Sequence, residues 1–419
     1  MASSLPHYET KTLENGLEVY VIPMENETGV ISTDIFYKVG SRNEVMGKTG
    51  IAHMLEHMNF KSSKNLKAGE FDEEVKSVGG VSNASTGFDF THYFIKSSSE
   101  NLGKSLSLFA ELMENLSLKD EEFQPERNVV AEERRWRTDN NPLGYLYFRL
   151  FNVAYTYHPY HWTPIGFMND IQTWTIDDIR DFHATYYQPG NAILLITGDI
   201  DPETAFVEAE KQFGQIKNTK AIPEVKFVEP KQDGPERVVL HKDSEVEMVA
   251  IVFHIPDFRH PDQPALSAIS EMLSSGKSSR LYEQLVDKKR MVNQVYAYNA
   301  ENTDPGLFIF LAVCNPGVKA EEAEQELIAQ IGKIKGSKVS PEELEKVKVN
   351  TRADFIFSLE SSASVANLFG SYLARGDLKP LEAYEAQINA LDAETIQKAA
   401  QRYFDFNVST TIILRKGEE

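Results

Sequence analysis

A charged, proline-rich segment divides the 419-residue chain into two halves that repeat one order of predicted elements. The segment, Lys217 to Pro235, holds three prolines, one glycine and many charges, which is typical of a linker. Strands and helices in mixed order, with hairpins, predict an α+β fold rather than a parallel βαβ array. We therefore expect an internal duplication with two homologous domains, at residues 1–216 and 236–419, joined by the linker 217–235.

The individual elements follow from hydrophobic periodicity and turn residues. In the first half we predict a hairpin with its turn at Asn15-Gly16 and, after it, the strands Val30–Val39, Val81–Thr86, Phe90–Lys96 and Asn191–Gly198. One helix is predicted to begin near Thr49. Four more are predicted at Glu100–Leu116, Pro125–Asp139, Asp177–Tyr187 and Asp201–Phe213. In the second half we predict strands at Arg237–Leu240, Met248–Ile255, Gln294–Ala300, Leu307–Val313 and Thr410–Leu414. Its helices are predicted at Gln263–Leu273 and from Ala320 and Pro341.

Composition excludes several classes of function. A formal charge of −20 repels phosphate backbones, which argues against a general nucleic-acid binder. No apolar run approaches the ~18 residues that a membrane span needs. The one cysteine, Cys314, rules out an internal disulfide and all-cysteine metal sites, and its setting in LAVCN predicts a buried apolar position. The first residues show no signal peptide, so the compartment is left open between cytoplasm and a periplasm reached through a removed signal.

The most informative helix contains two histidines four residues apart. His53 and His57 project side by side from one face, as a metal-binding pair must, and Glu56 lies in the same polar patch. The apolar residues Ile51, Met54, Leu55 and Met58 fall on the opposite face. Glu56 is placed to deprotonate a water molecule on the metal without being a ligand itself. A solvated polar face is the alternative.

Catalytic zinc usually has three protein ligands, so a carboxylate is needed from elsewhere. The helix that starts at Pro125 offers Glu126 and Glu133, which share a face, and Glu132, which points about 100° away. On local evidence, Glu133 could equally form an i,i+4 ion pair with Arg137, and Glu126 could complement the helix dipole. The ligand therefore stays open at this point.

The chain resembles the inverzincin peptidases of the pitrilysin and mitochondrial processing peptidase family. The resemblance begins with His53-Met54-Leu55-Glu56-His57 followed 76 residues later by Glu133, and it covers nearly the whole chain. Further family-like segments are Gly50–Ala52, Met58–Lys61, Gly79–Thr86, Glu126–Glu133, His158–Tyr160, Pro164–Gly166, Gly190–Asp199 and Gly276–Tyr282.

The resemblance implies a role for each of these residues. His53, His57 and Glu133 would be zinc ligands, Glu56 the general base, and Glu126 a carboxylate that supports a ligand histidine. The reaction implied is zinc-dependent hydrolysis of peptides by an endopeptidase. The alternative is a non-catalytic structural or assembly subunit, against which the intact HxxEH motif and Glu133 argue.

The resemblance also implies how substrate is held. Asn83, Ala84 and Ser85 would lie on an exposed edge strand, to which an extended peptide adds as another strand. The alternative for Asn83 is the end of a strand or a turn. The second half has no histidine in the helix that corresponds to the zinc helix, so we expect it to bind no metal and to enclose a substrate chamber with the first half.

One departure from the family concerns partners. Family members commonly carry an arginine and a tyrosine seven residues apart in the second half, and these positions read Val286 and Asn293 here. Arg290 with Tyr296 has the wrong spacing, and a solvated basic turn is the expected role of Arg290. We therefore expect a heterodimer with a homologous, metal-free subunit that carries the pair, or a homodimer of low activity.

Other histidines and the tryptophans receive structural interpretations. We expect no metal at the four histidines His92, His158, His241 and His254. The three tryptophans, Trp136, Trp162 and Trp174, are expected to be packing anchors.

Overall fold

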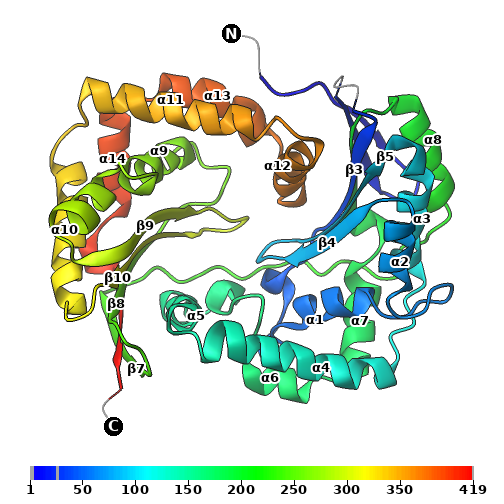
Figure 1. Ribbon diagram of the computed structural model, residues 1–419, viewed down its shortest axis with the longest axis horizontal. Coiled ribbons are helices and arrows are strands. Elements are labelled where there is room, and N and C mark those ends of the chain that lie inside the picture. Colours follow the sequence, from blue (N-terminus) through cyan, green and yellow to red (C-terminus); the bar gives the residue numbers. More distant parts are fainter. Residues whose placement is uncertain (1–3, 25–27, 418–419) are drawn as a thin grey trace. The chain divides into compact units, whose positions relative to one another are not determined.

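The computed structural model describes residues 4–24 and 28–417 and divides into two compact units (Figure 1). Unit 1 comprises Met1–Arg134, Trp162–Phe227 and Phe357–Leu378. Unit 2 comprises Arg135–His161, Val228–Ile356 and Lys379–Glu419. Each unit contains one β-sheet with packed helices, so the α+β class is confirmed.

The sheet of unit 1 has six strands in the order β1-β2-β6-β3-β5-β4. They are β1 (Glu9–Thr12), β2 (Glu18–Pro23), β3 (Val30–Tyr37), β4 (Val81–Thr86), β5 (Thr91–Ser98) and β6 (Ala192–Gly198). Neighbouring strands are antiparallel except β2 and β6, which are parallel. Gly16 adopts a φ of 89° between β1 and β2, which confirms the predicted hairpin turn. β4 forms one edge of this sheet.

Helices cover both faces of this sheet. They are α1 (Ile51–Asn59), α2 (Glu70–Ser77), α3 (Leu102–Glu114), α4 (Asp120–Arg134), α6 (Met168–Thr173), α7 (Ile176–Tyr186), α8 (Pro202–Phe213) and α12 (Ser362–Ala374). On one face, α1, α3, α4 and α7 share a buried core with the sheet (Figure 1). On the other face, α12 packs against β3 and β6, where a Cβ on Gly370 would lie 2.1 Å from the Phe36 ring.

Unit 2 repeats the plan. Its sheet has the order β7-β11-β8-β10-β9, with β7 (Glu236–Lys242), β8 (Met248–His254), β9 (Val292–Ala300), β10 (Leu307–Cys314) and β11 (Thr410–Lys416). Its helices are α5 (Pro142–Ala154), α9 (Gln263–Ser274), α10 (Ala320–Gly336), α11 (Pro341–Phe357, which ends at the border with unit 1), α13 (Lys379–Ala390) and α14 (Ala393–Tyr403). Short 3-10 helices lie at Ser41–Asn43, Ser99–Asn101, Pro159–His161, Pro189–Asn191 and Phe406–Val408, and π-helical turns at Arg135–Asp139 and Tyr282–Lys288.

Five of the six strands in the sheet of unit 1 match the five strands of unit 2 in order, and β1 has no counterpart. Strands β2, β6, β3, β5 and β4 correspond to β7, β11, β8, β10 and β9, and the parallel pair occupies the same place in both sheets. In chain order, helix α1 follows β3 in unit 1, and helix α9 follows the corresponding strand β8 in unit 2. The predicted pair of homologous sheet-and-helix domains is confirmed at the level of topology. The substrate chamber stays a prediction.

The units differ from the predicted domains 1–216 and 236–419 by two exchanged segments. Helix α5 packs against β7, β8 and β11 and therefore belongs to unit 2, whereas α12 belongs to unit 1. Residues 217–235 form no helix or strand, and the border between the units falls inside them, after Phe227.

One predicted helix boundary is wrong. Helix α4 begins at Asp120, so Pro125 lies inside the helix rather than at its start. Three acidic residues in the first turn complement the positive end of the helix, and Phe123 is fully buried there. These two contributions stabilise a turn that the proline alone does not predict.

Candidate metal centre

Helix α1 presents the predicted polar face. Its apolar residues Ile51, Met54, Leu55 and Met58 are at most 2% exposed, whereas His53, Glu56 and His57 are half-buried on the opposite side. The helix packs against α4, α7 and β4 of unit 1. The 3.6-residue periodicity therefore separates a core face from a face that carries three ionisable groups.

The start of α1 is fixed by close packing. Its N-cap residue, Gly50, adopts a φ of 85°, which is favourable for glycine alone. A Cβ at this position would lie 2.7 Å from the carbonyl oxygen of Ile165 and 2.9 Å from the ring of Trp174. Asp170 accepts hydrogen bonds from the backbone N–H (2.9 Å) and hydroxyl (2.7 Å) of Thr49. Helix α6 and the residues on either side of it thus hold the end of α1 that precedes His53.

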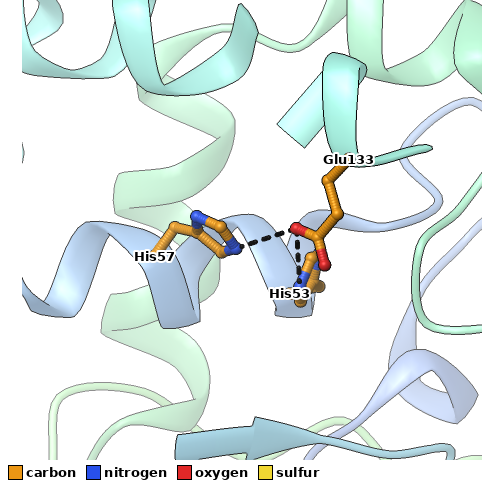
Figure 2. A group of neighbouring side chains, drawn as sticks. All are labelled: His53, His57 and Glu133. Carbon is orange, nitrogen blue, oxygen red and sulfur yellow. Dashed lines mark ion pairs between the residues drawn. The ribbon is translucent and has the colours of Figure 1, made fainter. Parts of the chain in front are cut away.

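Two histidines and a glutamate converge above this helix (Figure 2). Oε2 of Glu133 lies 3.4 Å from Nε2 of His57 and 3.7 Å from Nε2 of His53, and the three ligand atoms lie within 4.8 Å of one another. Tetrahedral zinc with bonds of about 2.0–2.1 Å places its ligand atoms roughly 3.4 Å apart. The donor set and its spacing therefore fit a zinc ion.

Helix α4 provides the carboxylate. Glu133 is half-buried, its neighbour Glu132 is exposed, and Val130 is fully buried on the side that packs inward. The structure thus brings Glu133, and not Glu132, to the two histidines. The local sequence does not decide between Glu132 and Glu133. The side of α4 that faces α1 decides it.

Glu126 forms a hydrogen bond with the side of the His57 ring that faces away from the proposed metal position. Its Oε1 accepts a hydrogen bond from Nδ1 of His57 at 2.8 Å, and its Oε2 forms an ion pair with Nζ of Lys61 at 2.6 Å. A partner on Nδ1 fixes the tautomer that presents Nε2 to a metal. Burial raises the pKa of Glu126. The hydrogen bonds from His57 and Lys61 lower the pKa by more than burial raises it, so the net shift is downward.

The same carboxylates act on His57. Burial lowers the pKa of His57, but hydrogen bonds and charges from Glu126 and Glu133 outweigh burial and raise it to about 9. In the absence of metal, the side chain of His57 is therefore protonated on both ring nitrogens at neutral pH. A metal ion must displace this proton in order to bind.

Glu56 lies beside the end of β4. The hydroxyl of Thr86, the last residue of β4, donates a hydrogen bond to Oε2 of Glu56. No pattern in the sequence indicates this role of Thr86, although the strand in which Thr86 lies is predicted. The contact ties the predicted general base to the edge strand.

The predicted substrate strand is an edge strand. β4 pairs with β5 alone among the described strands, and Asn83 and Ser85 are exposed whereas Ala84 is half-buried. Asn83 lies within the strand rather than at a turn, so its structural alternative is wrong. Binding of a peptide at this edge stays a prediction.

Glu44 is a second residue near this site that the sequence does not indicate. Its side chain is 2% exposed and accepts hydrogen bonds from the backbone N–H groups of Gly50 and Ala52, both at 2.8 Å, and from the indole of Trp162 at 2.9 Å. Burial raises the pKa of Glu44 to about 8, and the three donors oppose this rise. The spacing of Glu44 from α1 follows no helical periodicity, so no pattern in the sequence indicated it.

The remaining candidates have structural settings. His92 contacts Asp34 at 2.7 Å, His158 contacts Asp304 at 2.9 Å, His254 contacts a backbone carbonyl, and His241 is an exposed residue of β7. Within the described residues, the one group with metal-ligand spacing is His53, His57 and Glu133. Cys314 is fully buried, and burial raises the pKa of its thiol to about 12.

Two of the three tryptophans are packing anchors. Trp162 and Trp174 are at most 5% exposed. The prediction for Trp136 is wrong, because it is 74% exposed on the π-helical turn that follows α4. Arg290 is exposed with a φ of 52°, as expected for a solvated basic turn.

Comparison with known proteins places this geometry in a family. A family model described as insulinase (peptidase family M16) matches residues 20–155, and one described as peptidase M16 inactive domain matches residues 173–350. The zinc protease PqqE of Helicobacter pylori is 55% identical over 99% of this chain and 94% of its own length. The chain belongs to peptidase family M16.

Two further similar proteins agree with this assignment. The crystal structure of a protease from Helicobacter pylori matches with a TM-score of 0.97 and 55% identity, over 98% of this chain and 100% of that chain. The mitochondrial-processing peptidase subunit beta of Bos taurus is 23% identical over 96% of this chain and 82% of its own length. The resemblance to the pitrilysin and processing peptidase family is therefore confirmed. No helix among the described residues is long and apolar enough to cross a membrane.

Proposed function

We propose that this M16 chain is a zinc-dependent endopeptidase that hydrolyses peptides or unfolded segments. One observation carries the proposal: the ligand atoms of His53, His57 and Glu133 converge within 4.8 Å, and Glu56 shares the polar face of α1 with the histidines. The relationship to a zinc protease at 55% identity supports it.

The chain's own residues account for the proton transfers. Zinc, when bound by these three residues, supplies Lewis acidity that polarises a peptide carbonyl and acidifies a water molecule. Glu56, held by the hydroxyl of Thr86, takes the proton from the attacking water and transfers it to the leaving amine. Glu126 holds Nε2 of His57 toward the metal position throughout.

The edge of β4 is the proposed place for the substrate backbone. An extended peptide that pairs with Asn83, Ala84 and Ser85 would lie along the strand that ends at Thr86, next to Glu56. Backbone pairing reads main-chain groups more than side chains. We therefore propose a broad preference for extended peptides of different sequence.

The second candidate function is a non-catalytic subunit. Two observations favour it: the family model over residues 173–350 is described as an inactive domain, and Val286 and Asn293 stand where the resemblance leads us to expect an arginine and a tyrosine. A heterodimer reconciles them with an intact metal centre, because a homologous partner would supply the missing pair of donors. A relative named as a subunit, of the mitochondrial processing peptidase, is consistent with this arrangement.

The test is cleavage of an internally quenched peptide together with zinc content. The wild-type chain, assayed alone and with the candidate partner, should hold zinc and cleave the peptide. Glu56→Gln should keep zinc and lose at least about 100-fold in turnover, because it lacks the general base. Glu132→Gln is the matched control and should behave as wild type, since Glu132 is exposed on the same helix as Glu133.

Two results would contradict the proposal. Zinc without turnover in the presence of the partner would favour the non-catalytic subunit. Turnover that survives in Glu56→Gln would place the chemistry elsewhere. Peptides that co-purify with Glu56→Gln would identify the substrate class.

A further inference from the structure

The ligand helix α1 starts at a residue that cannot cap it. The first N–H groups of a helix have no partner inside the helix, and a Ser, Thr, Asp or Asn side chain commonly satisfies one of them. The N-cap of α1 is Gly50, whose φ of 85° and contact with Ile165 require glycine. The cap must therefore come from another part of the chain.

The side chain of Glu44 supplies this cap. Its Oε1 accepts the N–H of Ala52, and its Oε2 accepts the N–H of Gly50 and the indole N–H of Trp162. Both carboxylate oxygens are thus engaged by N–H donors, in a position that is 2% exposed.

The capped turn carries the first metal ligand. Ala52 directly precedes His53, so the backbone that Glu44 holds determines where the imidazole of His53 begins.

The other ligand helix is fixed to the same place. Arg134, which follows Glu133, is 4% exposed and donates a hydrogen bond to the carbonyl oxygen of Gly166. A Cβ on Gly166 would lie 2.4 Å from the carbonyl oxygen of Thr49, so the loop and the start of α1 are in tight contact. The start of α1 is therefore in contact, through Gly166, with the end of α4 that carries Glu133.

We propose that Glu44 is a positioning residue for the metal centre, which holds the first turn of α1 so that His53 meets His57 and Glu133. This inference rests on the proposed zinc site. It assigns Glu44 no contact with metal or substrate. Its effect is on the geometry and affinity of the site rather than on the chemical step.

The experiment compares Glu44→Gln with two further variants. An amide in place of the carboxylate has one acceptor oxygen, so its NH₂ group would face either Ala52 or the donors Gly50 and Trp162. Trp162→Phe keeps an aromatic ring and removes one donor of the three. Glu247→Gln is the matched control, because Glu247 accepts the N–H of Ala320 at 2.8 Å at the start of α10 in unit 2.

Three readouts are measured on each folded protein: zinc affinity by competition with a chelator, the visible absorption of the Co²⁺-substituted protein, and the unfolding temperature without metal. Glu44→Gln should bind zinc at least about tenfold more weakly, in the range seen when groups that orient metal ligands are replaced. Its Co²⁺ spectrum should differ from wild type. Trp162→Phe should shift affinity in the same direction by less, and Glu247→Gln should leave affinity and spectrum unchanged.

The readouts separate positioning from general stability. If Glu44→Gln has the wild-type affinity and Co²⁺ spectrum, the inference is wrong, whatever its unfolding temperature. If Glu44→Gln does not fold, Trp162→Phe decides, and wild-type affinity there would overturn the inference. A wild-type chain that binds no zinc would instead overturn the proposed function itself.

Discussion

At the scale of single residues, His57 lies between two carboxylates that favour its protonated form. Its pKa without metal is raised from 6.5 to about 9, because Glu126 and Glu133 outweigh the effect of burial. A histidine whose pKa is raised by folding stabilises the fold below its unfolded pKa, and this stability is lost as pH rises through the folded pKa.

We therefore expect the free energy of unfolding of the metal-free protein to fall between pH 6.5 and 9. Zinc affinity should rise over the same range, because the metal competes with fewer protons, and it should weaken toward pH ~6. Denaturant unfolding of chelator-treated wild type and His57→Gln measures the effect. Equal pH slopes for the two proteins would contradict it, as would zinc retention unchanged down to pH ~4.

Glu126 provides a second test at this scale. Glu126→Gln keeps the shape of the side chain but weakens its hydrogen bond with Nδ1 of His57. Zinc affinity should fall about 10- to 100-fold without being lost, as is usual for groups that orient metal ligands. Chelator competition measures this loss. An affinity equal to that of wild type would contradict a role of Glu126 in orienting His57.

The sequence predicts some of these residues and not others. His53, Glu56 and His57 follow from helical periodicity alone, because the i,i+4 spacing defines a face wherever the helix lies. The choice between Glu132 and Glu133 needs the packing of α4 on α1, which is a tertiary contact. Glu44 acts across a turn through backbone N–H groups, and such a contact leaves no periodic signal.

At the scale of elements, the start of α1 determines where both histidines lie. Gly50→Ala would combine an unfavourable positive φ with a contact of 2.7 Å to the oxygen of Ile165. Gly47→Ala is the matched control, because its φ is 92° but no atom lies within 4 Å of the added Cβ.

The control should lose about 1–2 kcal/mol of unfolding free energy from the φ angle alone. Gly50→Ala should lose more, and zinc affinity should fall in this variant only. Denaturant unfolding and chelator competition on both variants measure the difference. Equal losses would mean that the contact with Ile165 does not constrain α1.

The edge strand β4 gives a further prediction for elements. A peptide that pairs with β4 uses the N–H groups of every second residue for the ladder. Substrate peptides methylated on one alternate set of backbone nitrogens should therefore be cut much more slowly than peptides methylated on the other set. Steady-state cleavage of the two series measures it, and equal rates would exclude strand addition at Asn83 to Ser85.

Element boundaries show where sequence reasoning ends. Strand β4, Val81–Thr86, agrees with the prediction residue for residue, because the glycines that flank it are local signals. Helix α4 begins five residues before Pro125, because buried Phe123 and an acidic first turn stabilise it. The packing of α12 against β3 and β6 involves residues far apart in the chain, so no local pattern could predict it.

At the scale of the whole molecule, five strands of each sheet share one topology, but the three proposed metal ligands all lie in unit 1. Val286 and Asn293 lie in unit 2, where Val286 is half-buried in the π-helical turn and Asn293 is an exposed residue of β9. Neither side chain provides the charge of an arginine or the hydroxyl of a tyrosine for the developing oxyanion. We therefore expect the isolated chain to turn over peptides weakly.

Turnover should rise at least about tenfold when a homologous, metal-free subunit with the arginine and tyrosine is added, since one lost oxyanion donor costs about 10²–10³ in rate. The double variant Val286→Arg with Asn293→Tyr should reduce this dependence on the partner. Peptide cleavage across a titration of the partner measures both effects. Full activity of the chain alone, unchanged in the double variant, would contradict the heterodimer.

The most direct test of the metal centre is the zinc content of three purified proteins: wild type, Glu133→Gln and Glu132→Gln. These two glutamates are adjacent on α4, yet only Glu133 lies within 4.8 Å of the ligand atoms of His53 and His57. We expect one zinc ion per chain in wild type and in Glu132→Gln, and less than about a tenth of that in Glu133→Gln after brief exposure to a chelator. Full zinc in Glu133→Gln, or its loss in Glu132→Gln, would contradict the proposed metal centre.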